Sequence, residues 1–222
     1  VLCVLWLLEA QEAKAAGKKL PVLLPVDEGT SEPDFQAFRE RFLRAVEKRD
    51  AEFVWSITDP EIRIGFGSEN GLAAAKKEWN LGAPDSPMWQ EFEDLLKLGG
   101  VFEKREDGTR PFIAPYVYSK FPNELDCFGY GAIVGERVRV RETPSSTGAV
   151  IDNLSYDIVK LGPFNEKKET IDGRTYRWVA VELSGGRKGY VYGKYIRSPV
   201  DYRAFFEKVK GRWTLVLMVC GD

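Results

Sequence analysis

Apolar positions recur at helical spacing in three segments of the first hundred residues. In residues 35–49, apolar and charged side chains fall on opposite helical faces, which is the pattern of an amphipathic helix. Ser31 and Asp34 have the spacing of a capping box, so the helix is expected to begin there. Residues 71–79 and 88–98 also have helical patterns.

Shorter apolar runs in the same half of the chain predict strands. Residues 53–57 and 62–66 flank a predicted turn at 58–61, and the second run alternates apolar and polar positions. Residues 111–118 contain two prolines, which favour an edge or irregular strand. This order of elements predicts an α+β unit in which helices pack on an antiparallel sheet.

The pattern changes after residue 128 to short β-type runs separated by turn residues. About five strands within residues 129–199 predict a small all-β barrel. The sequence Ser-Gly-Gly-Arg at 184–187 favours a tight hairpin. Residues 164–173 form a long charged loop, which is expected either to gate a groove or to be solvated.

Two further apolar runs follow the predicted barrel. Residues 202–209 and 212–219 flank Lys210 and Gly211 and predict a hairpin. Such a hairpin needs a partner sheet to bury its apolar face. We expect the α+β unit to supply it, so that residues 31–128 and 200–222 form one domain with the barrel at 129–199 inserted before the hairpin.

The N-terminal residues resemble a targeting sequence. Eight consecutive apolar residues precede Ala13-Lys14-Ala15, which has the small-x-small spacing of a signal-peptidase site. Residues 1–16 are therefore expected to be the remnant of a signal peptide, with a linker at 17–30 and export to the periplasm or cell exterior. Charges near the cleavage site favour the alternative of a short buried helix. Eight apolar residues are too few to cross a bilayer, which takes about 20.

Composition excludes several kinds of chemistry. The 222 residues contain no histidine, so His-based nucleophile systems and the usual His-containing zinc sites are excluded within one chain. The three cysteines lie too far apart for a CxxC motif. The net charge is −2, with 16 basic and 23 acidic side chains in residues 1–127 and 16 and 11 in residues 128–222. We expect no cofactor, metal site, catalytic residue or nucleic-acid partner.

Motifs in the β-rich region resemble bacterial SH3 (SH3b, SH3_3-type) domains. Residues 138–144 read Val-Arg-Val-Arg-Glu-Thr-Pro, residues 178–181 read Trp-Val-Ala-Val, and residues 186–196 contain Gly-Tyr-Val and end in Tyr-Ile. The resemblance implies a module that binds cell-wall peptidoglycan or a protein ligand, or serves as a spacer. The eukaryotic Ala-Leu-Tyr-Asp-Tyr signature is missing from the sequence, so binding of proline-rich peptides is not implied.

Tyrosines and arginines of this region are the candidate ligand contacts, because tyrosine combines a flat apolar surface with a hydroxyl group. Alternation along strands implies that about half of them face outward. For any one of them, barrel packing is the alternative. The candidates are Tyr156, Tyr176, Tyr190, Tyr192, Tyr195, Arg139 and Arg141.

The flanking regions carry a second resemblance, to NTF2-like (cystatin-like α+β) domains, through residues 42–50 and the C-terminal hairpin. It implies two alternatives to an exported, non-enzymatic binding protein. One is an isomerase- or dehydratase-type enzyme with an Asp/Tyr cavity, for which Asp50, Asp59, Tyr116 and Tyr118 are available. The other is a purely structural protein that mediates assembly.

The predicted topology brings two of the cysteines to the domain junction. Cys127 precedes the barrel and Cys220 follows the hairpin, and an oxidising compartment would allow them to form a disulfide. Two separate thiols explain the same residues equally well.

Overall fold

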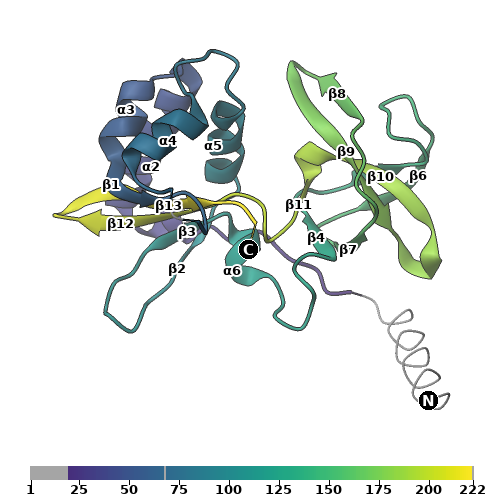
Figure 1. Ribbon diagram of the computed structural model, residues 1–222. Coiled ribbons are helices and arrows are strands. Elements are labelled where there is room, and N and C mark those ends of the chain that lie inside the picture. Colours follow the sequence, from purple (N-terminus) through teal and green to yellow (C-terminus); the bar gives the residue numbers. More distant parts are fainter. Residues whose placement is uncertain (1–19, 68, 222) are drawn as a thin grey trace, which may run out of the picture. The chain divides into compact units, whose positions relative to one another are not determined.

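The computed structural model describes residues 20–67 and 69–221, which form two compact units (Figure 1). The β unit consists of Pro122–Ser198 together with the described residues up to Leu24. The α+β unit consists of Pro25–Phe121 and the chain from Pro199 onward. The predicted signal-peptide remnant at 1–16 lies outside the described residues.

The α+β unit contains a five-stranded sheet assembled from both ends of the chain. Its strand order is β1 (Thr58–Arg63), β13 (Arg212–Val219), β12 (Arg203–Val209), β3 (Phe112–Ala114) and β2 (Val101–Phe102). The β1–β13 pair is parallel and the other pairs are antiparallel. The predicted C-terminal hairpin is confirmed, and its partner strands come from the first 121 residues.

Helices cover one face of this sheet (Figure 1). They are α2 (Pro33–Lys48), α3 (Ala51–Ile57), α4 (Leu72–Trp79) and α5 (Met88–Lys97). A 3-10 turn, η1 (Glu28–Ser31), precedes them, and a short helix, α6 (Tyr116–Lys120), follows β3. The three helices predicted from periodicity are confirmed, and the mixed α+β class is confirmed with them.

Aromatic side chains dominate the core between α2 and the sheet. The Phe35 ring centroid lies 4.1 Å from that of Phe112 and 6.0 Å from that of Phe206. Phe42, on the same face of α2, contacts the rings of Phe92 and Phe206. Burial of these large rings stabilises the packing of helix on sheet.

Two local predictions for this unit are wrong. Residues 53–57 form α3 instead of a strand, because the Asp50 carboxylate accepts a hydrogen bond from the Phe53 backbone N–H and caps the helix. The predicted turn at 58–61 is part of β1, an edge strand in which Pro60 is tolerated.

The predicted capping box and the extended segment at 111–118 also differ from the structure. Helix α2 begins at Pro33 after Glu32, without a side-chain cap, because the Ser31 hydroxyl donates to the Glu28 carbonyl instead. Only Phe112–Ala114 is extended, and the chain then turns into α6.

The β unit is built on a second sheet. Its hydrogen-bonded order is β11 (Ile196–Arg197), β4 (Tyr130–Ile133), β7 (Ile158–Leu161), β9 (Arg174–Glu182), β10 (Lys188–Tyr192), β5 (Val138–Arg141) and β6 (Val150–Leu154), and β8 (Lys168–Ile171) pairs with β9. All of its pairs are antiparallel. Short 3-10 turns, η2 (Ser184–Gly186) and η3 (Gly193–Tyr195), follow β9 and β10. The strand path ends at β11 and β6, so the described sheet is open and a closed barrel is not shown.

Aliphatic side chains form the core of the β unit, in contrast to the aromatic core of the α+β unit. Val140, Val181 and Val191 are buried at its centre. Gly189 allows β10 to approach β5 closely, because a Cβ at this position would lie 2.5 Å from the Val140 Cγ1 atom. The tight hairpin predicted at 184–187 is confirmed between β9 and β10.

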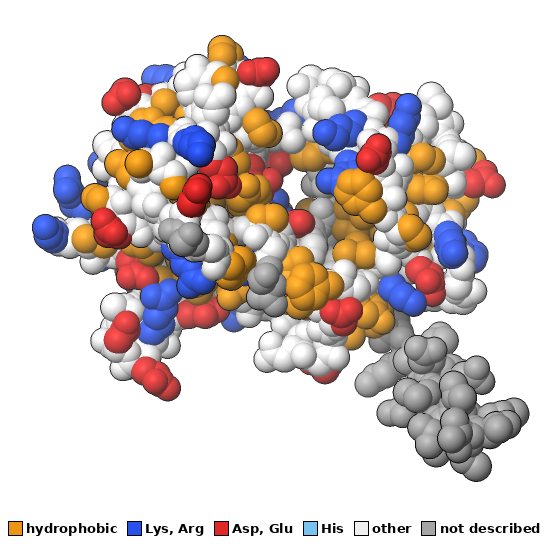
Figure 2. Space-filling model, in the orientation of Figure 1, with side chains coloured by type: hydrophobic (Ala, Val, Ile, Leu, Met, Phe, Trp, Pro, Cys, Tyr) orange, Lys and Arg blue, Asp and Glu red, His pale blue; other side chains and the backbone are white. Residues whose placement is uncertain are grey.

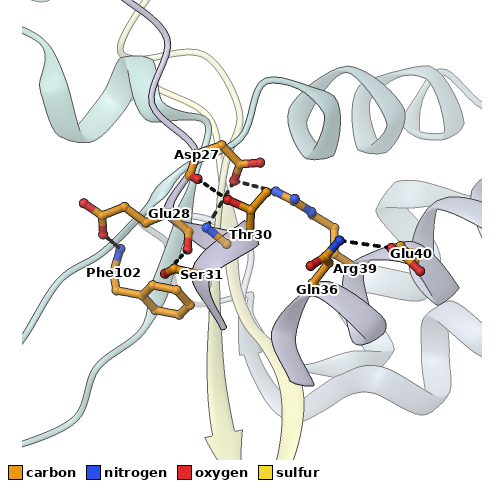
Figure 3. Close-up of polar contacts among 9 residues, drawn as sticks. Asp27, Glu28, Thr30, Ser31, Gln36, Arg39, Glu40 and Phe102 are labelled. Carbon is orange, nitrogen blue, oxygen red and sulfur yellow. Dashed lines mark hydrogen bonds and ion pairs between the residues drawn. The ribbon is translucent and has the colours of Figure 1, made fainter. Parts of the chain in front are cut away.

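The described part of the predicted linker makes specific contacts. Leu23 is buried, and its N–H donates to the Tyr156 carbonyl within the β unit. In the α+β unit, the Asp27 carboxylate accepts from the buried Arg39 guanidinium at 2.6 Å, and the Glu28 carboxylate accepts from the Phe102 N–H at 2.8 Å (Figure 3). These contacts fasten the chain before α2 to α2 and β2.

Candidate ligand-binding groove of the β unit

A groove of about 440 Å³ lies within the β unit. Strand β5, the loop after it, the β8–β9 turn and η3 form its walls, and β9 and β10 contribute its aromatic floor. This volume is within the range of small-ligand sites. Its lining residues are Glu136, Arg137, Val138, Arg139, Arg141, Ser146, Ile171, Asp172, Trp178, Tyr192, Lys194 and Tyr195.

Two nearly buried aromatic side chains form the floor of the groove. Trp178 on β9 and Tyr192 on β10 are directly paired across the sheet, and their ring centroids are 5.4 Å apart. The Tyr192 hydroxyl lies 2.7 Å from the Arg174 carbonyl oxygen, to which it donates. Burial raises the pKa of Tyr192 above its ordinary value, and the hydrogen bond to Arg174 holds the ring in place.

A carboxylate links the floor to the loop above it. Glu169 on β8 accepts hydrogen bonds from the Ser146 hydroxyl, from the Ser146 N–H at 2.8 Å and from the Trp178 indole N–H at 2.9 Å. The Ser146 donors are the main reason that the pKa of Glu169 lies below its usual value. The loop between β5 and β6, strand β8 and the indole are therefore held together.

The rim of the groove is charged. Arg137, Arg139 and Lys194 are exposed, and within residues 20–67 and 69–221 none of them forms an ion pair. Arg141 donates to the Gly148 carbonyl at 2.6 Å, which orders the loop after β5. Glu136 and Asp172 add two carboxylates, so four cations and two anions line the groove. Figure 2 shows that charges of both signs are also interspersed over the visible face of each unit.

The structure gathers some of the predicted ligand residues. Tyr192, Tyr195, Arg139 and Arg141 line the groove. Tyr176 does not line the groove, but its ring centroid lies 5.3 Å from that of Tyr192.

Tyr156 and Tyr190, like Tyr176, do not line this groove. Tyr156 adopts a left-handed backbone conformation with φ of 59° between β6 and β7, and its carbonyl accepts from the Leu23 N–H. Tyr190 is half-buried on β10, where it pairs with Arg141 and Ala180. Their roles in binding remain predictions.

Sequence reasoning missed several residues of the groove. Trp178 is not among the predicted ligand contacts, yet it is both buried and part of the floor. Ile171 and Asp172 belong to the charged loop at 164–173, which folds back as β8 against β9. The sequence signal for this strand is limited to the β-branched pair Thr170 and Ile171. Lys194 has no distinguishing sequence signal.

A smaller cavity of about 280 Å³ lies in the α+β unit, and its charged side chains are paired. Arg110 contacts Glu32 at 2.6 Å and lies over the Phe102 ring. Lys208 contacts Asp34 at 2.5 Å and lies over the Trp213 ring. Glu207 contacts Arg105 at 2.6 Å, so each charged side chain that lines this cavity has an ion-pair partner in the α+β unit.

The four residues that are candidates for an isomerase- or dehydratase-type activity line neither of these two cavities. Asp50 caps α3, and the Asp59 carboxylate accepts from the Glu61 N–H. Tyr116 is buried, and Tyr118 lies beneath the Arg203 guanidinium. In the described residues both carboxylates are thus used to order the backbone.

The cysteines and possible metal ligands add no further site. Cys127 is half-buried in the β unit, Cys220 is exposed in the α+β unit, and no disulfide joins them in the structure. The predicted Cys127–Cys220 disulfide would link the two units, and it stays a prediction. Within the described residues, no three Cys, Asp or Glu side chains are grouped as metal ligands, and no helix is long and apolar enough to cross a membrane.

Comparisons with known proteins find no matching family model, no matching curated protein and no matching solved structure.

Proposed function

We propose that the chain is a non-catalytic binding protein whose β unit, an SH3b-like module, holds a cell-wall or envelope-protein ligand in the groove above Trp178 and Tyr192. One observation carries the proposal. A groove of about 440 Å³ combines a fixed aromatic floor with rim cations that have no acidic partner in the described chain. Aromatic surfaces and oriented charged groups are the usual components of a binding site.

The positions of the motif residues support the SH3b-like interpretation. The Val-Arg-Val-Arg motif is strand β5, which places Val138 and Val140 in the core and Arg139 on the groove. The closing Gly-Tyr-Val motif is on β10, where Gly189 permits close packing against β5. We infer that this sheet curls into the small barrel typical of such modules.

Export to the periplasm or cell exterior belongs to the same proposal, because a wall ligand is reached only there. The signal-peptide-like pattern of residues 1–16 supports it. Fractionation of cells that express the chain with its native N-terminal region tests this part, and we expect the protein outside the cytoplasm. Retention of all the protein in the cytoplasm would contradict it.

Sedimentation with purified bacterial sacculi tests the binding function. The full 222-residue chain is expected to sediment with sacculi, and the double variant Arg139→Gln, Arg141→Gln is expected to remain largely in the supernatant. Lys188→Gln is the matched control, because Lys188 is an exposed cation of the same unit that does not line the groove. Equal sedimentation of all three proteins would exclude the groove as the site, and no sedimentation would remove wall binding.

A further inference from the structure

The groove rim carries charges of both signs, and this charge pattern favours ligands that carry both signs as well. Arg139 and Lys194 are exposed and lack ion pairs in the described part of the chain. Asp172 and Glu136, on the same rim, are also exposed and have no cationic partner among the described residues. A ligand in the groove therefore meets separate cationic and anionic groups.

The rigid floor limits the kind of ligand that fits between the charged groups of the rim. Trp178 is held by Glu169, and Tyr192 is held by the Arg174 carbonyl. Trp178 and Tyr192 are only 2% and 5% exposed, so they form a rigid base, and Tyr195, which is 40% exposed, supplies the accessible aromatic surface of the groove. The groove volume of about 440 Å³ suits a segment of a few residues and not a globular surface.

Resting on the proposed function, we infer that the groove binds a short peptide that carries both a carboxylate and an amino group. Guanidinium and ammonium groups on the rim form charge-assisted hydrogen bonds with a carboxylate. Asp172 and Glu136 attract an ammonium group and repel a polyanion such as a phosphate polymer. The exposed ring of Tyr195 packs against the apolar part of the peptide.

A set of matched peptides tests this inference by calorimetry with the full chain. The zwitterionic probe is Ala-Glu-Lys-Ala. C-terminally amidated Ala-Gln-Lys-Ala lacks carboxylates, and N-acetylated Ala-Glu-Leu-Ala lacks amino groups. We expect the Kd to rise about tenfold without carboxylates and about threefold without amino groups, and we expect inorganic polyphosphate to bind no more tightly than the zwitterionic probe.

Variants assign each preference to its side of the rim. Arg139→Gln with Lys194→Gln is expected to abolish the carboxylate preference, and Asp172→Asn the amino preference, while Lys188→Gln changes neither. Higher ionic strength is expected to weaken binding of the zwitterionic probe, because the rim charges are exposed.

Three results would overturn the inference: equal affinity for all three peptides, no binding of any of them, or tighter binding of polyphosphate. The sedimentation experiment separates this failure from failure of the proposed function. Groove-dependent sedimentation with no peptide preference would reject only the ligand class, whereas loss of both signals would reject both proposals.

Discussion

Each unit places a tryptophan indole against a carboxylate beside its cavity, but the remaining partners of the carboxylate differ. In the β unit, Trp178 donates to Glu169 at 2.9 Å, and neutral Ser146 supplies the other hydrogen bonds. In the α+β unit, Trp213 donates to Asp34 at 3.2 Å, and cationic Lys208 and the Phe35 N–H supply the other contacts.

This difference determines which charges remain available. Asp34 pairs with Lys208, a cation that lines the smaller cavity, and Glu32 pairs with Arg110 in the same way. Glu169 is satisfied by neutral donors, so it uses none of the rim cations of the groove. Similar residue types therefore produce a charge-compensated cavity in one unit and an uncompensated groove in the other.

Removal of the two indoles is expected to have the largest effect. Trp178→Ala removes a side chain that is only 2% exposed and is expected to lower the free energy of unfolding of the β unit by about 3–5 kcal/mol. Trp213→Ala, at a half-buried position, is expected to cost clearly less. Chemical denaturation of both variants measures the difference, and equal losses would contradict the assignment of Trp178 as a buried floor residue.

Neutralising the cations of each cavity in turn shows whether binding to sacculi depends on the unpaired cations of the groove or on the paired cations of the smaller cavity. Arg110→Gln with Lys208→Gln is expected to leave sedimentation with sacculi within twofold of the original chain, because these cations are already paired. The corresponding change at Arg139 and Lys194 is expected to reduce it about tenfold. If the α+β variant loses binding equally, the smaller cavity also contacts the ligand.

Acid is expected to weaken the Glu169 contacts. Hydrogen bonds from Ser146 hold the pKa of Glu169 below 4.5, its ordinary value. The stabilisation by this group is therefore fully present above about pH 4.5 and is lost as the pH falls through the lowered pKa. Thermal unfolding from pH 7 to pH 3 measures it, and Glu169→Gln is expected to reduce the acid-dependent loss.

Asp34 provides the control for this pH dependence. Its pKa is also lowered, chiefly by the hydrogen bond from Lys208, so Asp34→Asn is expected to remove a separate part of the acid response. If Glu169→Gln leaves the curve unchanged, the carboxylate does not stabilise the folded chain.

The exposed ion pair of the α+β unit is expected to have the smallest effect. The side chains of Lys208 and Asp34 are each about half exposed, so Lys208→Gln is expected to change the free energy of unfolding by at most about 0.5 kcal/mol. Denaturation at low and high salt measures this change, and a loss above 2 kcal/mol would show that the pair has a larger structural role.

Sequence patterns predicted the elements whose local signals agree with their tertiary environment. Residues 35–49 bury one helical face against the sheet, and the C-terminal runs flank a turn that suits a hairpin. The pattern failed at residues 53–57, where apolar side chains typical of a strand follow a capping aspartate. A single cap hydrogen bond and packing against neighbouring helices outweighed β propensity there.

The candidate groove was predictable only in part. Alternation along β5 placed Arg139 opposite the core residues Val138 and Val140, so its outward position followed from period 2. The contribution of Asp172 did not follow, because it depends on β8 folding back onto β9 and on the Glu169 contact with Ser146.

The sequence by itself determined the mixed α+β class, the absence of histidine chemistry and the β-rich character of the region after residue 128, because composition and periodicity are local properties of the chain. Only the tertiary structure decided which charges are paired and that Trp178 forms the floor of a groove. Those outcomes depend on contacts between segments distant in sequence, such as Glu169 with Ser146 and Asp34 with Lys208.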